Sequence, residues 1–111
     1  MARYTSFFMT GSSPEDISKA LVSALEACDL NLIYQNRVCI VAKEKPGSVS
    51  LSQLATIELL ISPPTGKNGD SKIDLVVKNE ELPLRTQNHC QEIFSQVNQA
   101  IATANAESIA S

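Results

Sequence analysis

Residues 57–78 read IELLISPPTGKNGDSKIDLVVK, two runs of β-prone side chains separated by a stretch rich in proline and glycine. Pro63-Pro64 ends the first run because proline cannot donate to a strand ladder, and Asn68-Gly69 suits the positive φ of a tight turn. The segment therefore predicts a β-hairpin. Both runs carry apolar side chains at odd and at even positions, so only one apolar set can face a core.

A strand and a helix are predicted at the start of the chain. Residues 3–9 are aromatic and β-prone and stop at Thr10-Gly11. Ser13 is then a helix cap, Pro14 suits the first helical position, and acids follow in the first turn. One face of this helix is predicted to carry Ile17, Leu21, Ala24, Leu25 and Cys28. That face is expected to pack on a core.

Two further strands precede the quoted hairpin. LNLIYQN and RVCIVAK, residues 30–36 and 37–43, meet at Asn36 and predict a tight turn. The second of these strands has two possible registers, with either Val38, Ile40 and Ala42 or Cys39 and Val41 pointing inward. The long connection over residues 44–53, EKPGSVSLSQ, follows.

The chain after the hairpin predicts a second amphipathic helix over residues 88–104. Its apolar face carries Cys90, Ile93, Phe94, Val97, Ile101 and Ala104. The order is β-α-β-β-β-β-α, which predicts an α+β two-layer sandwich with a largely antiparallel sheet and two helices on one face. This order resembles the kinase-associated C-terminal domain and the TATA-binding-like architecture, a likeness of topology that implies no function by itself.

Composition excludes several functional classes. The 111 residues, 43% of them hydrophobic, fit one domain over 1–105 with a frayed tail over 106–111. A formal charge of −3 with scattered basic residues disfavours nucleic acid. Three widely spaced cysteines and a start unlike a signal peptide predict a reduced, cytoplasmic location. No stretch is long and apolar enough for stable membrane insertion.

Alternation along the strands predicts which side chains meet the helices, since residues two apart share a sheet face. The helix-facing set is predicted to be Leu30, Leu32, Tyr34, Ile57, Leu59, Ile61, Ile73, Leu75 and Val77. The opposite face is left with a narrow apolar stripe of Ile33, Leu60, Val76 and one of Cys39, Ile40 or Val41. Its polar border is formed by Asn31, Gln35, Thr56, Glu58, Lys72, Asp74 and Lys78.

An apolar centre with a polar border is typical of an interaction patch. Isolated apolar residues are also common on solvated sheet faces, and a covering loop over residues 44–53 is a third explanation. We predict a small non-enzymatic protein-binding domain, an assembly or regulatory factor or an accessory subunit, without a cofactor. The partner is another protein or a second copy in a homodimer. The predicted binding residues are Ile33, Val41, Glu58, Leu60, Asp74, Val76 and Lys78.

The alternative function is a small-molecule or lipid carrier that uses the space between helices and sheet. Phe7, Phe8, Tyr34 and Phe94 line that space in this hypothesis, whereas a simple domain uses the same rings to fill its core. A basic corner around residues 37–45 makes contact with lipid headgroups a minor possibility, because Glu44 interrupts it.

Catalytic patterns are weak. His89 is the only histidine, and helix neighbours such as His89 and Cys90 diverge by about 100°. His89 is expected to reach Glu92 instead, and Glu80-Glu81 reads as solvated surface charge. The GKNGDSK stretch resembles a phosphate loop, but a strand rather than a helix follows it, so it is read as a turn. An enzyme is therefore not predicted.

Overall fold

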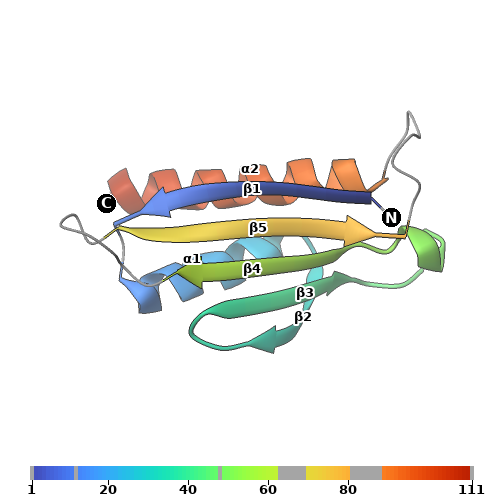
Figure 1. Cartoon of the computed structure of the whole chain (residues 1–111), viewed down its shortest axis with the longest axis horizontal. Coiled ribbons are helices and arrows are strands. Elements are labelled where there is room, and N and C mark those ends of the chain that lie inside the picture. Colours follow the sequence, from blue (N-terminus) through green and yellow to red (C-terminus); the bar gives the residue numbers. More distant parts are fainter. Residues whose placement is uncertain (1, 12, 48, 63–69, 81–88, 111) are drawn as a thin grey trace.

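The structure is a computed structural model that describes residues 2–11, 13–47, 49–62, 70–80 and 89–110, without the side chains of residues 14 and 105–110. Its elements follow the predicted order along the chain (Figure 1). They are β1 (Ala2–Thr10), α1 (Pro14–Ala27), β2 (Leu30–Gln35), β3 (Cys39–Glu44), the 3-10 helix η1 (Leu51–Gln53), β4 (Thr56–Ser62), β5 (Ser71–Asn79) and α2 (His89–Ala110).

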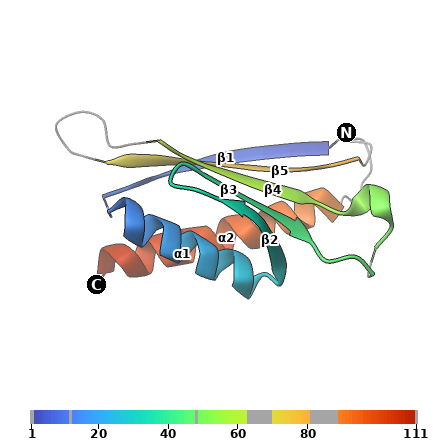
Figure 2. The same ribbon diagram turned by 90° about the horizontal axis from the view of Figure 1, so that it is seen from below.

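The strands form a five-stranded sheet in the order β1-β5-β4-β3-β2, and every neighbouring pair is antiparallel. The last strand, β5, lies between β1 and β4, so β1 at the start of the chain forms one edge of the sheet. Both helices lie on the same side of this sheet (Figure 2). The predicted α+β two-layer class is therefore confirmed.

Helix α1 begins as its sequence predicts. The Ser13 hydroxyl accepts a hydrogen bond from the Asp16 N–H at 3.3 Å, and Glu15 and Asp16 lie in the first turn. These groups satisfy a free amide and complement the positive end of the helix dipole. The predicted inner face is buried at Ile17, Leu21, Ala24 and Leu25 and partly buried at Cys28.

The β2–β3 hairpin turns at Asn36, as predicted. The Asn36 side-chain oxygen accepts hydrogen bonds from the N–H groups of Val38 and Cys39 at 2.9 and 2.7 Å. Its backbone N–H donates to the Cys39 carbonyl at 2.8 Å. Ile40 and Ala42 are fully buried, which selects the first of the two registers left open by the sequence. Val38, the third residue of that register, precedes β3 and is 51% exposed.

A β-bulge at Ile33 reverses the face of the residues that follow it. Leu32 pairs with Ala42 and Tyr34 pairs with Val41, so Ile33 is the extra residue of β2. Tyr34 therefore shares a face with Val41, and the prediction that it faces the helices is wrong. Leu32 stays in register with the buried Ala42 but is 40% exposed.

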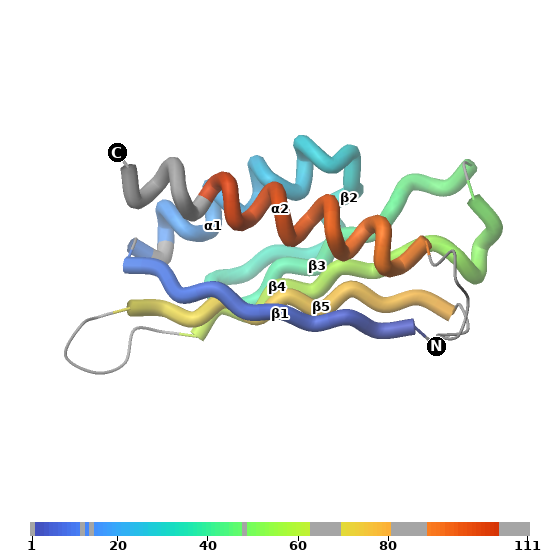
Figure 3. The backbone as a smooth tube through the Cα atoms, turned by 90° about the horizontal axis from the view of Figure 1, so that it is seen from above, coloured from blue at the N-terminus to red at the C-terminus, as the bar shows by residue number. Residues whose placement is uncertain are grey.

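The core lies between the sheet and the two helices. The predicted inward positions of β4 and β5 are each at most 5% exposed: Ile57, Leu59, Ile61, Ile73, Leu75 and Val77. Helix α2 contributes Cys90, Ile93, Val97 and Ile101, and its Phe94 ring packs against Tyr4 with centroids 5.7 Å apart. The tube in Figure 3 shows α2 running along β1 and β5.

Glu44 anchors the connection between β3 and β4. Its carboxylate oxygens lie 2.7 and 2.9 Å from His89 Nε2, and one accepts a hydrogen bond from the Ala55 N–H at 2.8 Å. The described part of residues 44–53 lies beyond one end of the sheet in Figures 1 and 2. It does not cover the sheet face opposite the helices, so the covering-loop explanation is wrong.

Two predictions fall at the limits of the described chain. The turn over residues 63–69 lies outside the described residues, although β4 and β5 pair antiparallel on either side of it. The predicted frayed tail, 106–111, has a helical backbone to Ala110, and its side chains lie outside the described residues. Among the described residues, no helix is long and apolar enough to span a membrane.

Candidate functional site

We call the sheet face opposite the helices the open face. The strand register determines which side chains lie on it. Residues paired across neighbouring strands point to the same side of a sheet, and the direction alternates along each strand. The central cross-strand row of the open face contains Thr5, Val76, Glu58, Val41 and Tyr34. The next row contains Phe7, Asp74, Leu60 and Cys39.

Six apolar side chains lie close together on this face. Phe7, Met9, Tyr34, Val41, Leu60 and Val76 form the apolar patch. Leu60 is 48% exposed and Phe7 is 61% exposed, whereas Val76 at the centre is only 9% exposed. Val76 does not belong to the core cluster, so its neighbours on the open face bury it. The patch therefore has a buried floor and raised apolar sides.

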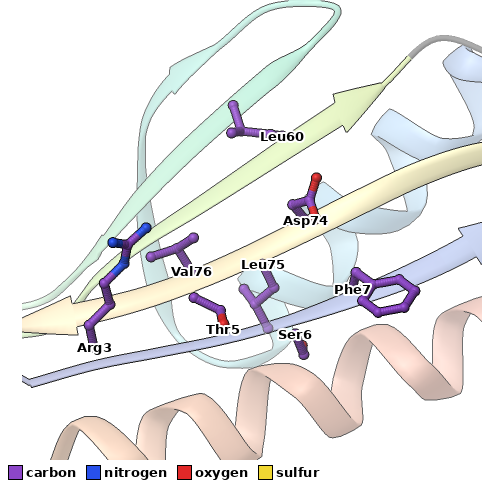
Figure 4. A pocket seen from close by; sticks show the side chains of 8 residues that line it. All are labelled: Arg3, Thr5, Ser6, Phe7, Leu60, Asp74, Leu75 and Val76. Carbon is purple, nitrogen blue, oxygen red and sulfur yellow. The ribbon is translucent and has the colours of Figure 1, made fainter.

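A hollow of about 610 Å³ lies on this floor (Figure 4). Phe7 and Leu60 stand on either side of it, from β1 and β4, with Val76 and Asp74 on β5 between them. Arg3 reaches over one end. Such a hollow provides space for one or two apolar side chains of a partner, which is how interface anchors bind.

Charged side chains are interspersed with the apolar patch. Lys78 pairs with Glu58 at 2.9 Å, and Lys72 pairs with Asp74 at 3.5 Å. The Lys72 ammonium also lies 4.9 Å above the Phe7 ring. Among the described residues, the other open-face cations, Arg3 and Lys43, have no carboxylate partner. Four basic and two acidic side chains give the described open face a net charge of +2.

The structure brings together most of the residues predicted to bind a partner. Six of them share the open face: Val41, Glu58, Leu60, Asp74, Val76 and Lys78. Ile33 is also exposed, but it lies at the bulge and has no partner in the β3 register. The polar members do not form a separate border, because Glu58 and Asp74 lie inside the patch and are paired with lysines.

Sequence reasoning missed three members of the patch: Phe7, Met9 and Tyr34. The β1 sequence is apolar on both faces, so its alternation does not identify the inner side before its partner strand is known. Phe7 and Tyr34 were expected to line the interior, and both instead point outward with 61% and 53% of their surface exposed. The i, i+2 spacing of Phe7 and Met9 was the available signal.

The side chains of His89 and Cys90, which the sequence already argues against as a nucleophile pair, contact different groups. Cys90 is fully buried, and its thiol donates to the Val77 carbonyl with an S···O distance of 3.4 Å. His89 binds Glu44 and lies 3.9 Å from Glu92, the partner expected from the sequence. No group of three or more metal-ligating side chains occurs within the described ranges. The Glu44–His89 contact joins the end of β3 to the start of α2, which are far apart in the sequence.

Burial raises the pKa of the Cys28 thiol. Because the thiolate is the reactive form, we expect iodoacetamide to label Cys28 more slowly in the folded chain than in the urea-unfolded chain at the same pH. The half-maximal rate is expected at a higher pH when the chain is folded. Peptide mass spectrometry follows the labelling of all three cysteines in one sample. The same pH of half-maximal labelling for folded and unfolded Cys28 would contradict the raised pKa.

The sequence matches no protein-family model, and no curated protein is significantly similar to it. Solved structures nevertheless share its fold. An uncharacterized protein from Bacillus thuringiensis matches 95% of this chain and 99% of its own, with a TM-score of 0.61 and 9% identity. Ara h 8.0201 matches 99% of both chains, with a TM-score of 0.61 and 11% identity. The chain therefore shares the fold of these two proteins.

Proposed function

We propose that this protein is a non-enzymatic binding module whose open face holds another protein. The observation that carries the proposal is the apolar patch, which exposes Phe7, Leu60 and neighbouring side chains on the sheet face that no described helix or loop covers. Exposed apolar side chains around a buried centre, with charged groups among them, are typical of protein interfaces. The protein then acts as an assembly or regulatory factor or as an accessory subunit.

Burial on the opposite face favours this proposal over a carrier that uses the helix–sheet interior. Ile57, Leu59, Leu75 and Val77 have no accessible surface at all. A cavity large enough for a ligand would leave accessible surface on the side chains around it. The burial of these four side chains on the described strands β4 and β5 therefore supports the proposal over a carrier that uses the interior.

The charge of the open face supports a partner that carries acidic groups. The described open face is positive, with the cations of Arg3 and Lys43 lacking a carboxylate partner within the described residues. A second copy would bring two positive faces together, whereas an apolar surface flanked by carboxylates would complement both the patch and its cations. The partner is therefore a different protein with an acidic border around its apolar contact.

Site-specific photo-crosslinking tests this proposal. A benzoylphenylalanine at position 60 is expected to crosslink a partner in native extract, on a peptide that contains both apolar and acidic residues. The same group at position 51 is the matched control, because Leu51 is 82% exposed but lies in η1, outside the open face. Mass spectrometry of the crosslinked peptide identifies the partner and its contact residues.

Other outcomes would contradict the proposal. Identical products from positions 51 and 60 would mean that the open face is ordinary surface. Crosslinks between copies of this chain, together with a dimer in analytical ultracentrifugation, would replace the foreign partner with a homodimer.

A further inference from the structure

A second hollow, the end hollow, lies on the helix side of the sheet, opposite the apolar patch, near the start of α1. The start of α1, the tip of the β2–β3 hairpin, the end of β4 and the start of β5 converge there (Figure 1). The hollow has a volume of about 850 Å³, within the range of small-molecule sites. Its lining includes Ser18, Lys19, Arg37, Val38, Ile61 and Ser71.

Ser71 is the distinctive residue of this hollow. It is 1% exposed, and its hydroxyl has no hydrogen-bond partner within the described part of the chain. Leaving a buried hydroxyl unpaired is unfavourable, so such groups are rare in folded proteins and need an explanation. A ligand group that bonds to Ser71 Oγ would supply the missing partner.

Charge and polarity define what such a ligand carries. Lys19 and Arg37 line the hollow, and neither makes an ion pair among the described residues. Glu15 is the single carboxylate among the described lining residues, which therefore have a net charge of +1. Val38 and Ile61 add apolar surface close to these cations.

We infer that this end hollow binds a small amphiphilic organic anion. Its anionic group lies between Lys19 and Arg37, its apolar body packs on Val38 and Ile61, and a hydrogen-bonding group meets the hydroxyl of Ser71. This site shares no residue with the apolar patch, so the inference is independent of the protein-binding function. It also differs from a carrier that uses the space between the helices and the centre of the sheet.

Two fluorescent probes that differ by one sulfonate test the inference. 8-Anilinonaphthalene-1-sulfonate is anionic, and N-phenyl-1-naphthylamine is its neutral counterpart. Fluorescence titration is expected to give saturable binding of one anionic probe per chain. Arg37→Gln and Lys19→Gln are expected to weaken binding of the anionic probe by about fivefold or more and to change binding of the neutral probe far less, because each substitution removes a charge but only one or two methylene groups.

Ser71→Val tests the inner part of the site. Valine replaces the hydroxyl and occupies more of the hollow, so affinity for both probes is expected to fall by about fivefold or more. Circular dichroism and thermal unfolding check that this variant folds. The Arg37 and Lys19 variants keep the test decisive if it does not, since both side chains are exposed.

Leu60→Glu on the open face separates the two hollows. The end-hollow site predicts unchanged affinity for both probes in this variant. The inference is overturned if the anionic probe does not saturate on wild-type protein, if the charge variants bind it as wild type does, or if Leu60→Glu removes its binding. Loss of binding in Leu60→Glu would place the probe on the apolar patch. Failure of the protein-binding proposal shows only in the crosslinking experiment and does not change any of these probe results.

Discussion

Leu59→Ala is expected to lower the free energy of unfolding by about 2–5 kcal/mol, the usual range for removing most of a buried leucine. Leu59 has no exposed surface and pairs in register with the buried Ile40 and Leu75. Its truncation removes apolar contacts and leaves a cavity in the fully buried core. Urea denaturation followed by circular dichroism measures the loss.

Leu60→Ala is the matched control, because it removes the same atoms from the next residue of β4. Leu60 is 48% exposed and pairs with Cys39 and Asp74 on the open face. Its expected cost is below about 1 kcal/mol, as for most surface substitutions. Equal losses for the two variants would contradict the assignment of β4 faces, on which the apolar patch depends. The slope of the denaturation curve should be the same in both variants.

The sequence was sufficient to predict the features that local chemistry determines. The Ser13 cap with acids behind it fixes the start of α1, and Asn36 fixes the β2–β3 turn through its own side-chain hydrogen bonds. Strict alternation in β4 and β5 separates Leu59 from Leu60 because a strand has a side-chain period of two. Leu60 and Val76, two of the six residues of the apolar patch, followed from this alternation.

Long-range pairing determines the features that the sequence did not predict. The bulge at Ile33 depends on the β3 register, and it moves Tyr34 from the core to the open face. Phe7 and Met9 joined the patch only because β1 pairs with β5, the strand farthest from it in sequence order. The contact between Glu44 and His89 spans 45 residues and has no local pattern to signal it.

Leu60→Glu is expected to weaken binding of the partner identified by crosslinking by about 30-fold or more, the range of a central interface residue. A carboxylate at this position would lose its water on binding and would face the acidic border that we propose for the partner. Leu51→Glu introduces the same charge at an exposed leucine outside the open face and is expected to bind as wild type does. Surface plasmon resonance with purified partner measures both.

Salt and charge variants separate the apolar and electrostatic contributions to this interface. Arg3→Gln and Lys43→Gln are expected to slow association several-fold at low salt and to have little effect on dissociation, because exposed charges at an interface mainly steer encounter. Leu60→Glu should instead accelerate dissociation. Equal weakening by Leu51→Glu and Leu60→Glu would mean that net charge rather than the apolar patch controls binding, and the open face would then lose its proposed role.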